Sequence, residues 1–247
     1  MTTARVDLHV KVFDERTRDR ARRRGLDAVV YAPHFTPWPE IRRRATALST
    51  AELLVVPARE IFTGSWRDRK HVLALGLTEP VPDFIPLEVA MAELADQGAC
   101  VLAPHPAYLT ISLAPTDLEH HRDQLRAVER YNPKFLPWHG PRARRLARAI
   151  DRPAFASSYA HLRTSVGAAW TEIEGPIEAE ADLLEALRGG HIAGVGRIDG
   201  FAHRRTAAIE LAHLVHENSI EKARRVLGPG REPTHPTRAL YGGRFDT

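Results

Sequence analysis

Cysteine is nearly absent from this 247-residue sequence, and the one present, Cys100, cannot form an intrachain disulfide. It lies in the apolar run ACVLA, so we expect it to act as a small buried hydrophobic residue. No apolar run of about 18 residues occurs, which argues against a membrane-spanning helix. We also find no basic stretch leading into an apolar one, so we identify no secretory signal and expect a cytoplasmic location.

Several common catalytic signatures are also missing. The sequence contains no Walker-type phosphate loop, no Ser-centred nucleophile elbow and no CxxC pair. The glycine-rich stretch GVGRIDG (194–200) does not have the spacing of a dinucleotide-binding fingerprint, and we interpret it as a turn. The function therefore has to be sought in other combinations of residues.

Lysine is scarce, because the 35 basic residues comprise 31 Arg and only 4 Lys. The net charge of +4 and the pI near 9.5 suggest anionic partners, and arginine suits bidentate contacts with phosphate. The arginine runs at 18–24, 42–44 and 142–148 lie in predicted helices without interleaved aromatic residues. We interpret these runs as solvated helix faces, with contact to nucleic acid as the alternative.

What the sequence does contain is an alternation of short apolar strands and polar, Arg-rich helices. The predicted strands cover 5–11, 27–32, 53–61, 70–77, 99–105, 125–132 and 153–161. Such alternation predicts parallel strands with helices outside them. Seven strands in about 160 residues favour a closed, TIM-like (β/α)7 barrel over a small open sheet, and the chain is long enough for one such domain.

The pattern changes after residue 165. An extended segment, a helix, a short strand and a long amphipathic helix (205–227) follow, and no linker separates them from the barrel. We expect a barrel core over 4–165, a small C-terminal α/β extension over 166–227 packed on the same domain, and a loop-like tail over 228–247. His213 and His216 share the long helix, where packing or a seam of a homo-oligomer is the expected role.

Ionisable side chains recur at the ends of the predicted strands. In the first strand, alternation is expected to place Asp7, His9 and Lys11 on one face. The recurring residues are His9, His34, Glu60, His71, His105 and His161. Parallel barrels build active sites at the carboxyl ends of their strands, so these side chains are expected to converge. Imidazoles with a carboxylate are ligands for Zn, Mn or Fe, and such metals activate water for cleavage of phosphate esters.

These strands and their polar ends together resemble the PHP family, named for polymerase and histidinol phosphatase, over about residues 5–200. The matching pieces, in the family's order, are VDLHVK, GLDAVVYAPH, VVPARE, HVLALGL, VLAPHP, VERYN and SSYAH. The segment VGAAWTEIEG and the helix after it resemble the region often found behind that domain. The resemblance implies a distorted seven-stranded barrel that holds up to three divalent metals.

Carried over position by position, the resemblance assigns Glu60, His71 and His105 to one metal. His34 and His161 would hold a second, whose third ligand is open, with Asp14 as a candidate. The third metal would use His9, Glu60 and the positions occupied here by Lys11 and Tyr159, where the family has His and Asp. Because a protonated Lys cannot ligate a metal and its ammonium could take the metal's place, we predict one or two metals instead of three.

The resemblance implies a metal-dependent hydrolase of phosphate esters, acting on a small phosphorylated metabolite or on a nucleotide or oligonucleotide end. Lys11 and Tyr159 are the candidate catalytic residues, although Tyr159 could instead only pack. Arg163 and Arg197 are the candidate substrate-binding residues, with a simple surface role as the alternative. Two rival hypotheses remain: a barrel without turnover that binds RNA or protein, and an enzyme for a non-phosphate substrate.

Overall fold

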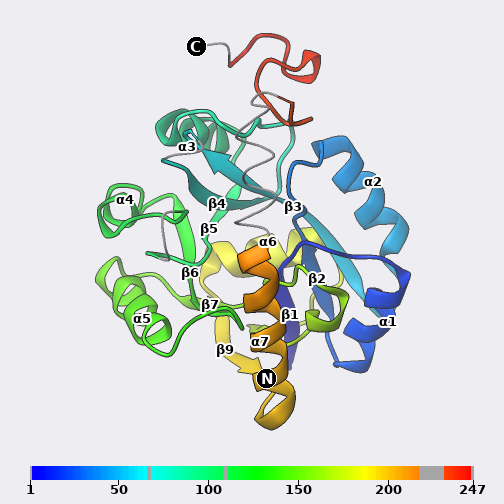
Figure 1. The fold of residues 1–247 in the computed structure, drawn as a ribbon. Coiled ribbons are helices and arrows are strands. Elements are labelled where there is room, and N and C mark those ends of the chain that lie inside the picture. The colour runs from blue at the N-terminus through cyan, green and yellow to red at the C-terminus, as the bar shows by residue number, and fades with distance from the viewer. Residues whose placement is uncertain (1, 66–67, 108–110, 217–230, 246–247) are drawn as a thin grey trace.

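The computed structural model describes residues 2–65, 68–107, 111–216 and 231–245. In these residues nine strands form one sheet, in the order β7-β6-β5-β4-β3-β2-β1-β8-β9. They are β1 (Thr3–Val10), β2 (Ala28–Tyr31), β3 (Leu54–Thr63), β4 (Lys70–Leu75), β5 (Cys100–Ala103), β6 (Leu125–Tyr131), β7 (Ala154–Ala156), β8 (Ala169–Glu174) and β9 (Ile192–Arg197). Figure 1 shows the sheet curled around one interior, with helices α1 to α5 on its outer side.

The two ends of the sheet come together, so that the sheet is nearly closed into a barrel. The Thr171 hydroxyl of β8 accepts a hydrogen bond from the Ala156 nitrogen of β7 and donates one to the Ala156 oxygen, at 3.0 and 2.7 Å. An isolated bridge also pairs Val10 at the end of β1 with Ala160, just after β7. These contacts bring the carboxyl ends of β1 and β7 together.

The number of strands differs from the seven predicted, because the C-terminal extension contributes to the sheet itself. β8 pairs antiparallel with β1, and β9 pairs antiparallel with β8. Buried residues alternate with more exposed ones along β8, as expected for a strand with one face on a core. The extension thus covers what would otherwise be an unpaired edge of β1, and the prediction of a seven-stranded barrel was wrong in this respect.

The direction of β4 also differs from the parallel arrangement predicted. β4 pairs antiparallel with both β3 and β5. Only residues 64–69 separate it from β3, too few for the crossover connection that a parallel pair requires. The first residues of β4 therefore lie at the end of the barrel where β3 and β5 finish. We call this end, which also holds the carboxyl ends of β1, β2, β6 and β7, the mouth.

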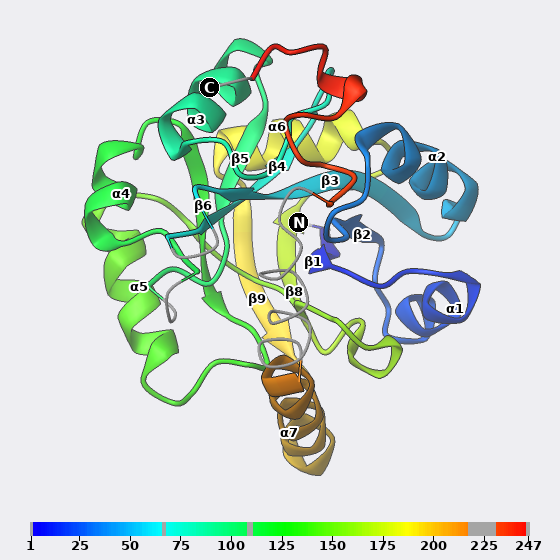
Figure 2. The same cartoon turned by 45° about the horizontal axis from the view of Figure 1, so that its top comes forward.

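Most of the helices cover the outside and the far end of this barrel, whereas the last of them, α7, contacts its mouth through Glu210. They are α1 (Glu15–Arg23), α2 (Trp38–Leu48), α3 (Leu87–Asp96), α4 (Pro115–His120), α5 (His139–Ala149), α6 (Glu180–Gly189) and α7 (Gly200–His216). Leu183 and Leu187 of α6 join the same buried cluster as Cys100, which is fully buried as predicted. Figure 2 shows α6 lying across the strands. No helix in the described ranges is long and apolar enough to span a membrane, and residues 217–227 of the predicted last helix lie outside those ranges.

An irregularity in β1 controls which of its side chains reach the interior. The pairing of β1 with β2 shifts register between Asp7 and Val10. Leu8 belongs to the inner buried cluster, whereas Val10 belongs to the outer one between sheet and helices, although two residues on a regular strand share a face. Such a bulge re-aims side chains. It separates Asp7, which accepts hydrogen bonds from the Ser158 and Gly167 nitrogens, from His9 in the mouth.

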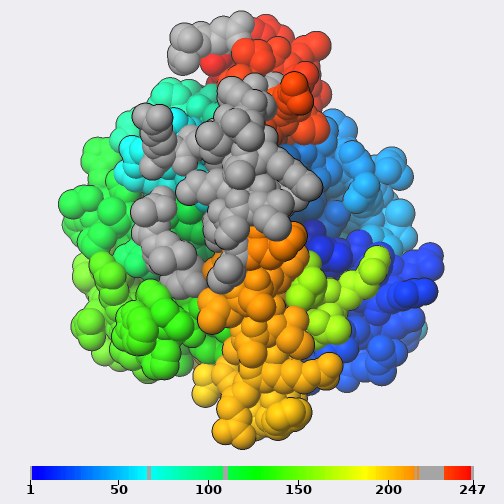
Figure 3. All heavy atoms as spheres, viewed as in Figure 1, coloured from blue at the N-terminus to red at the C-terminus, as the bar shows by residue number. Residues whose placement is uncertain are grey.

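The described part of the tail, residues 231–245, is fastened to the barrel through a buried aspartate. Asp83 accepts hydrogen bonds from the Phe62 nitrogen at 2.9 Å and from the Thr234 hydroxyl, and its own nitrogen donates to the Thr234 oxygen. Its partner Arg59 is fully buried and donates to it at 2.9 Å. Figure 3 shows these tail residues gathered at one end of the molecule, where Arg244 pairs with Glu93 of α3. A short 3-10 helix, Ala239–Tyr241, is the tail's only regular element in the described residues.

Replacing Asp83 with alanine is expected to lower the free energy of unfolding by about 3–5 kcal/mol, because it leaves the Arg59 charge buried without its partner. Urea unfolding followed by circular dichroism measures the loss. Asp123 provides the matched control, since it also pairs with an arginine but is 86% exposed, and its replacement with alanine should cost less than about 1 kcal/mol. Equal losses in the two variants would show that the buried pair is not a major contributor to stability.

Candidate metal centre

Glu60, near the carboxyl end of β3, lies in the middle of the mouth. Val56 and Ala58 of the same strand belong to the inner cluster, so strand alternation carries Glu60 to the interior as well. Its carboxylate oxygens lie near nitrogens of Lys11 (2.6 Å), His34 (2.8 Å), His105 (3.0 Å), His71 (3.3 Å) and His9 (3.6 Å). Burial alone would raise the pKa of Glu60, but the charge of Lys11 and the surrounding imidazoles hold it well below its usual value.

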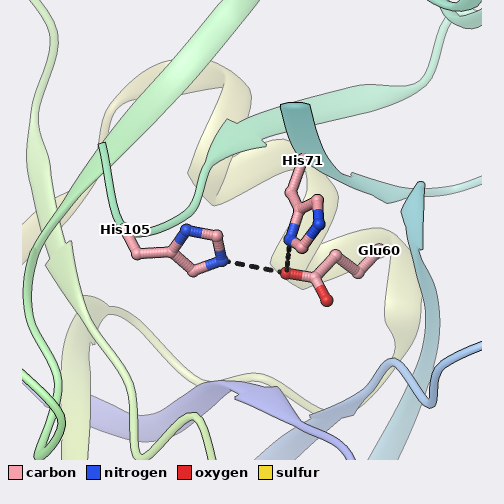
Figure 4. A group of neighbouring side chains, drawn as sticks. All are labelled: Glu60, His71 and His105. Carbon is pink, nitrogen blue, oxygen red and sulfur yellow. Dashed lines mark hydrogen bonds and ion pairs between the residues drawn. The ribbon is translucent and has the colours of Figure 1, made fainter. Parts of the chain in front are cut away.

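Glu60, His71 and His105 form a buried group whose ligand atoms lie within 4.8 Å of one another. Figure 4 shows both imidazoles directed at the same carboxylate oxygen, with the second oxygen turned away from them. His71 is the second residue of β4 and reaches the mouth because that strand runs antiparallel to β3. The three side chains lie together, as the sequence predicted. His71 reaches the other two because β4 is antiparallel to β3, which was not predicted.

His105 is held by its surroundings with a defined ring orientation. Its backbone nitrogen donates to Glu129 at 2.7 Å, and its ring Nδ1 lies 3.0 Å from the Ser112 hydroxyl, which leaves Nε2 facing Glu60. Its φ of +32° is in the left-handed region, which costs free energy for a residue other than glycine. Strained backbone held in place by such contacts is frequent at functional sites.

Burial favours the neutral, metal-binding form of His9, His34 and His71 in the mouth. Burial lowers the pKa of His71 to about 4 and, together with the charge of Lys11, that of His34 to about 3. Burial and Lys11 likewise place the pKa of His9 well below its usual value. Both ring nitrogens of His9 and the Nε2 atom of His71 are buried without a hydrogen-bond partner among the described residues, and each such atom costs about 1–3 kcal/mol. A cation that accepts nitrogen ligands would satisfy them.

Lys11 lies just past the end of β1 and puts a positive charge beside the central carboxylate. Its Nζ is 2.6 Å from Glu60 and donates a hydrogen bond to the Ala32 oxygen at 2.8 Å. Burial lowers the pKa of Lys11 to about 8, and Glu60 opposes that change, so the group is mainly an ammonium at pH 7. The prediction that Lys11 replaces a metal ligand and brings its own charge to the centre fits this geometry.

A second buried lysine, Lys134, lies beside His161 and was not identified from the sequence. Its Nζ is 2.6 Å from His161 Nδ1 and 3.0 Å from Glu210 of α7, and it donates to the Tyr159 oxygen. Glu210 also accepts hydrogen bonds from the nitrogens of His161 and Leu162. The scarcity of lysine was the available signal in the sequence, since one of only four Lys residues stands two positions after the VERYN motif. Together these contacts fasten α7 over the mouth.

Tyr159 lies between the imidazoles, with 3% of its surface exposed. Its ring centroid is 4.7 Å from that of His9, 5.0 Å from that of His105 and 4.7 Å from that of His161. The Lys134 ammonium lies over the same ring at 3.9 Å, a cation–π contact. Tyr159 thus packs against three of the predicted metal ligands, which favours a role in orienting them.

The two predicted substrate-binding arginines lie in different surroundings. Arg163 is 60% exposed and pairs at 2.6 Å with Asp14, which caps the N-terminus of α1. Asp14 is the candidate third ligand of the second metal. Its carboxylate is instead engaged by Arg163 and by the capping hydrogen bond from Thr17. Arg197 ends β9 and lies over the Tyr131 ring at 5.0 Å. Within the described residues, neither arginine has a contact with Glu60.

A second group with metal-ligand composition lies at the surface and serves as a comparison. Glu88, His120 and His121 also bring three ligand atoms within 4.8 Å of one another. Glu88 and His120 are exposed, and the carboxylate is separated from the interior. Exposed carboxylates can remain hydrated and have little need of a metal, whereas the buried Glu60 group cannot be hydrated in the same way. The mouth is therefore the better candidate.

Comparisons with known proteins agree with the family resemblance. Residues 137–192 match the family model described as PHP-associated, PHP_C. A solved structure of PsfC from Pseudomonas syringae PB-5123 has 18% sequence identity and a TM-score of 0.64, covering 87% of this chain and 100% of that one. A structure from Bifidobacterium adolescentis, provisionally described as a metal-dependent phosphoesterase, has 16% identity and a TM-score of 0.49, covering 64% and 88%. No curated protein matches the sequence.

These comparisons differ in what they establish. The PHP-associated match runs from just before α5 to the start of β9, beyond the segment that suggested it, and over these residues it agrees with the predicted PHP resemblance. The likeness to PsfC shows a shared fold over most of the chain. The likeness to the Bifidobacterium structure is too weak to support an argument.

Proposed function

We propose that this chain, a member of the PHP family, is a metal-dependent hydrolase of phosphate esters. The observation that supports this most directly is the buried group of Glu60, His71 and His105 at the mouth. Two imidazoles and one carboxylate form a ligand set that suits Zn, Mn or Fe. A metal bound there would act as a Lewis acid on a phosphoryl oxygen and lower the pKa of water.

In this proposal the residues around the metal ligands set the charge and the orientation of the centre. Glu60 supplies the negative charge, and Lys11 supplies the second positive charge that another metal would provide in a multi-metal centre. The Lys11 ammonium can stabilise negative charge that develops on a phosphate ester, since it is buried and fixed by the Ala32 oxygen. Tyr159 positions the rings of His9 and His105.

We further propose that one metal, and not two, is bound. A second divalent ion held by His34 and His161 would face the ammonium groups of Lys11 and Lys134. Lys11 contacts the same Glu60 oxygen as His34, and Lys134 contacts His161 directly. Repulsion between buried like charges is strong because the protein interior screens it weakly. The two lysines thus take over much of the charge of the missing metals.

The rival hypothesis, a barrel that binds a partner without turnover, draws on the same lysines. A mouth in which Glu60 is already neutralised by Lys11 has less need of a metal. The unsatisfied ring nitrogens of His9 and His71 argue against this reading, because a purely structural site would be expected to give them partners.

The substrate class is tested by assaying the purified protein after supplementation with Zn, Mn or Fe. The panel contains p-nitrophenyl phosphate, bis-p-nitrophenyl phosphate, AMP and a 5′-phosphorylated oligonucleotide, with a carboxylic ester as a control for non-phosphate substrates. We expect hydrolysis of at least one phosphate ester, and loss of that activity on chelation. A metal-loaded protein that hydrolyses none of the phosphate esters would contradict the proposal.

A further inference from the structure

A cavity of about 600 Å³ lies beside the candidate metal centre, between the region where β6 leads into α5 and the region where β9 leads into α7. In Figures 1 and 2, α5 lies to one side of β9 and α7 continues from its end. Six of its lining residues have charged, polar or aromatic side chains: Arg130, Tyr131, Phe135, Arg144, Arg197 and His203. Its volume is in the range of small-molecule sites. We call it the arginine cavity.

The cavity and the metal centre share one wall. Tyr131 and Pro133 line the cavity. The residues that alternate with them, Asn132 and Lys134, are buried on the other side, where Asn132 donates to Glu129 and Lys134 contacts His161. A ligand in the cavity would therefore lie next to the mouth without occupying it.

The charge of the cavity calls for an anionic ligand. Three arginines from three elements, Arg130 in β6, Arg144 in α5 and Arg197 in β9, line it, and the described lining residues include no Asp or Glu. Arg130 and Arg144 form no ion pair within the described part of the chain, and Arg197 has only Asp199, at 3.7 Å and 85% exposed. Guanidinium groups gathered without carboxylates match the geometry of phosphate oxygens.

Aromatic side chains accompany these arginines. Tyr131 donates or accepts a hydrogen bond with His203 at 3.1 Å and presents its ring to Arg197, and Phe135 lines the same cavity. Trp138 and Phe201 are the most exposed large apolar side chains among the described residues, at 62% and 76%. Each lies within three residues of a lining residue in sequence. Aromatic side chains in a positively charged groove are platforms on which nucleobases stack, and Tyr131 and Phe135 line this cavity.

We infer that the arginine cavity binds a nucleotide, with its phosphate on the arginines and its base against the aromatic side chains. This inference goes beyond the proposed hydrolysis, because binding in the cavity requires neither a metal in the mouth nor turnover. A nucleotide combines the two chemistries that the cavity presents, a compact anion and a flat ring. Inorganic phosphate would meet only the first of these.

Isothermal titration of the full chain with AMP, in the presence of EDTA to prevent hydrolysis, tests the inference. We expect saturable binding that Arg144→Glu weakens at least tenfold. Arg145→Glu is the matched control, since Arg145 lies on the same helix, is also exposed and does not line the cavity, and it should change the affinity less than twofold. His105→Ala should retain AMP binding, which separates this inference from the proposed function.

Three results would overturn the inference. The first is the absence of saturable AMP binding, and the second is equal affinity in the Arg144→Glu and Arg145→Glu variants. The third is binding of inorganic phosphate as tight as that of AMP, which would show an anion site without a role for the base. Arg144 is exposed, so loss of binding in its variant does not reflect misfolding, and an unchanged circular dichroism spectrum verifies this.

Discussion

Replacement of His105 with alanine is expected to remove the bound metal and to lower phosphate ester hydrolysis by more than about 100-fold. Loss of a residue that only supports a metal ligand typically costs 10–100-fold in affinity or activity, so loss of a ligand itself should cost more. His105 is fully buried, and its Nε2 faces the Glu60 carboxylate at 3.0 Å, which makes it a strong ligand candidate. Metal content is measured by plasma mass spectrometry on protein freed of excess metal.

His121→Ala is the matched control for this variant. His121 is also buried and belongs to the surface group with Glu88 and His120. Metal content and activity should remain at the wild-type level in this variant. Because the left-handed φ of His105 is unfavourable for alanine too, His71→Ala serves as a second test, and it should give the same loss. Full metal stoichiometry in both His105→Ala and His71→Ala would show that the centre has been placed wrongly.

Replacement of Lys11 with methionine is expected to lower the free energy of unfolding by about 3–5 kcal/mol when no metal is present. The reason is that the Glu60 carboxylate would remain in the interior without the cation 2.6 Å away from it. Added Zn or Mn should restore part of this stability, since a metal at 100 times its Kd stabilises the folded state by about 2.7 kcal/mol. Urea unfolding with and without metal measures both effects.

Lys70→Met is the control for this experiment, because Lys70 also forms a lysine–carboxylate pair, with Asp117 at 2.9 Å, but is partly exposed. The Lys70→Met variant should lose less unfolding free energy than Lys11→Met, and added metal should not change that loss. The double variant Lys11→His with Tyr159→Asp extends the test, since it restores the two residues that the family has at these positions. It should bind one more metal per chain than the wild type. If Lys11→Met were as stable as Lys70→Met and the double variant gained no metal, Lys11 would not be a substitute for a metal.

Much of the centre could be predicted from the sequence because its residues stand at strand ends in a fixed order. Four imidazoles have a nitrogen within 3.6 Å of the Glu60 carboxylate, those of His9, His34, His71 and His105, as the PHP motifs implied. The alternation of side chains along a strand also explains why Arg59, the neighbour of Glu60, faces away from the mouth and pairs with Asp83.

Other features could not be predicted because they depend on partners distant in sequence. The contacts of Lys134 with His161 and with Glu210 join residues 27 and 76 positions apart. The same holds for the placement of β8 beside β1, which brings Glu172 opposite Arg5. The sequence predicted that the segment is extended, but it could not show which edge of the sheet the segment would join.

The sequence by itself determined the alternation of strands and helices, the resemblance to the PHP family, and the identity of the side chains that meet at the mouth, because periodicity and motif order are properties of neighbouring residues. The tertiary structure decided the reversed direction of β4, the nine-stranded closure and the two ammonium groups that face Glu60 and His161. These depend on which strands pair and which charges are buried together, and the free energies of pairing and burial are set only once the whole barrel has closed.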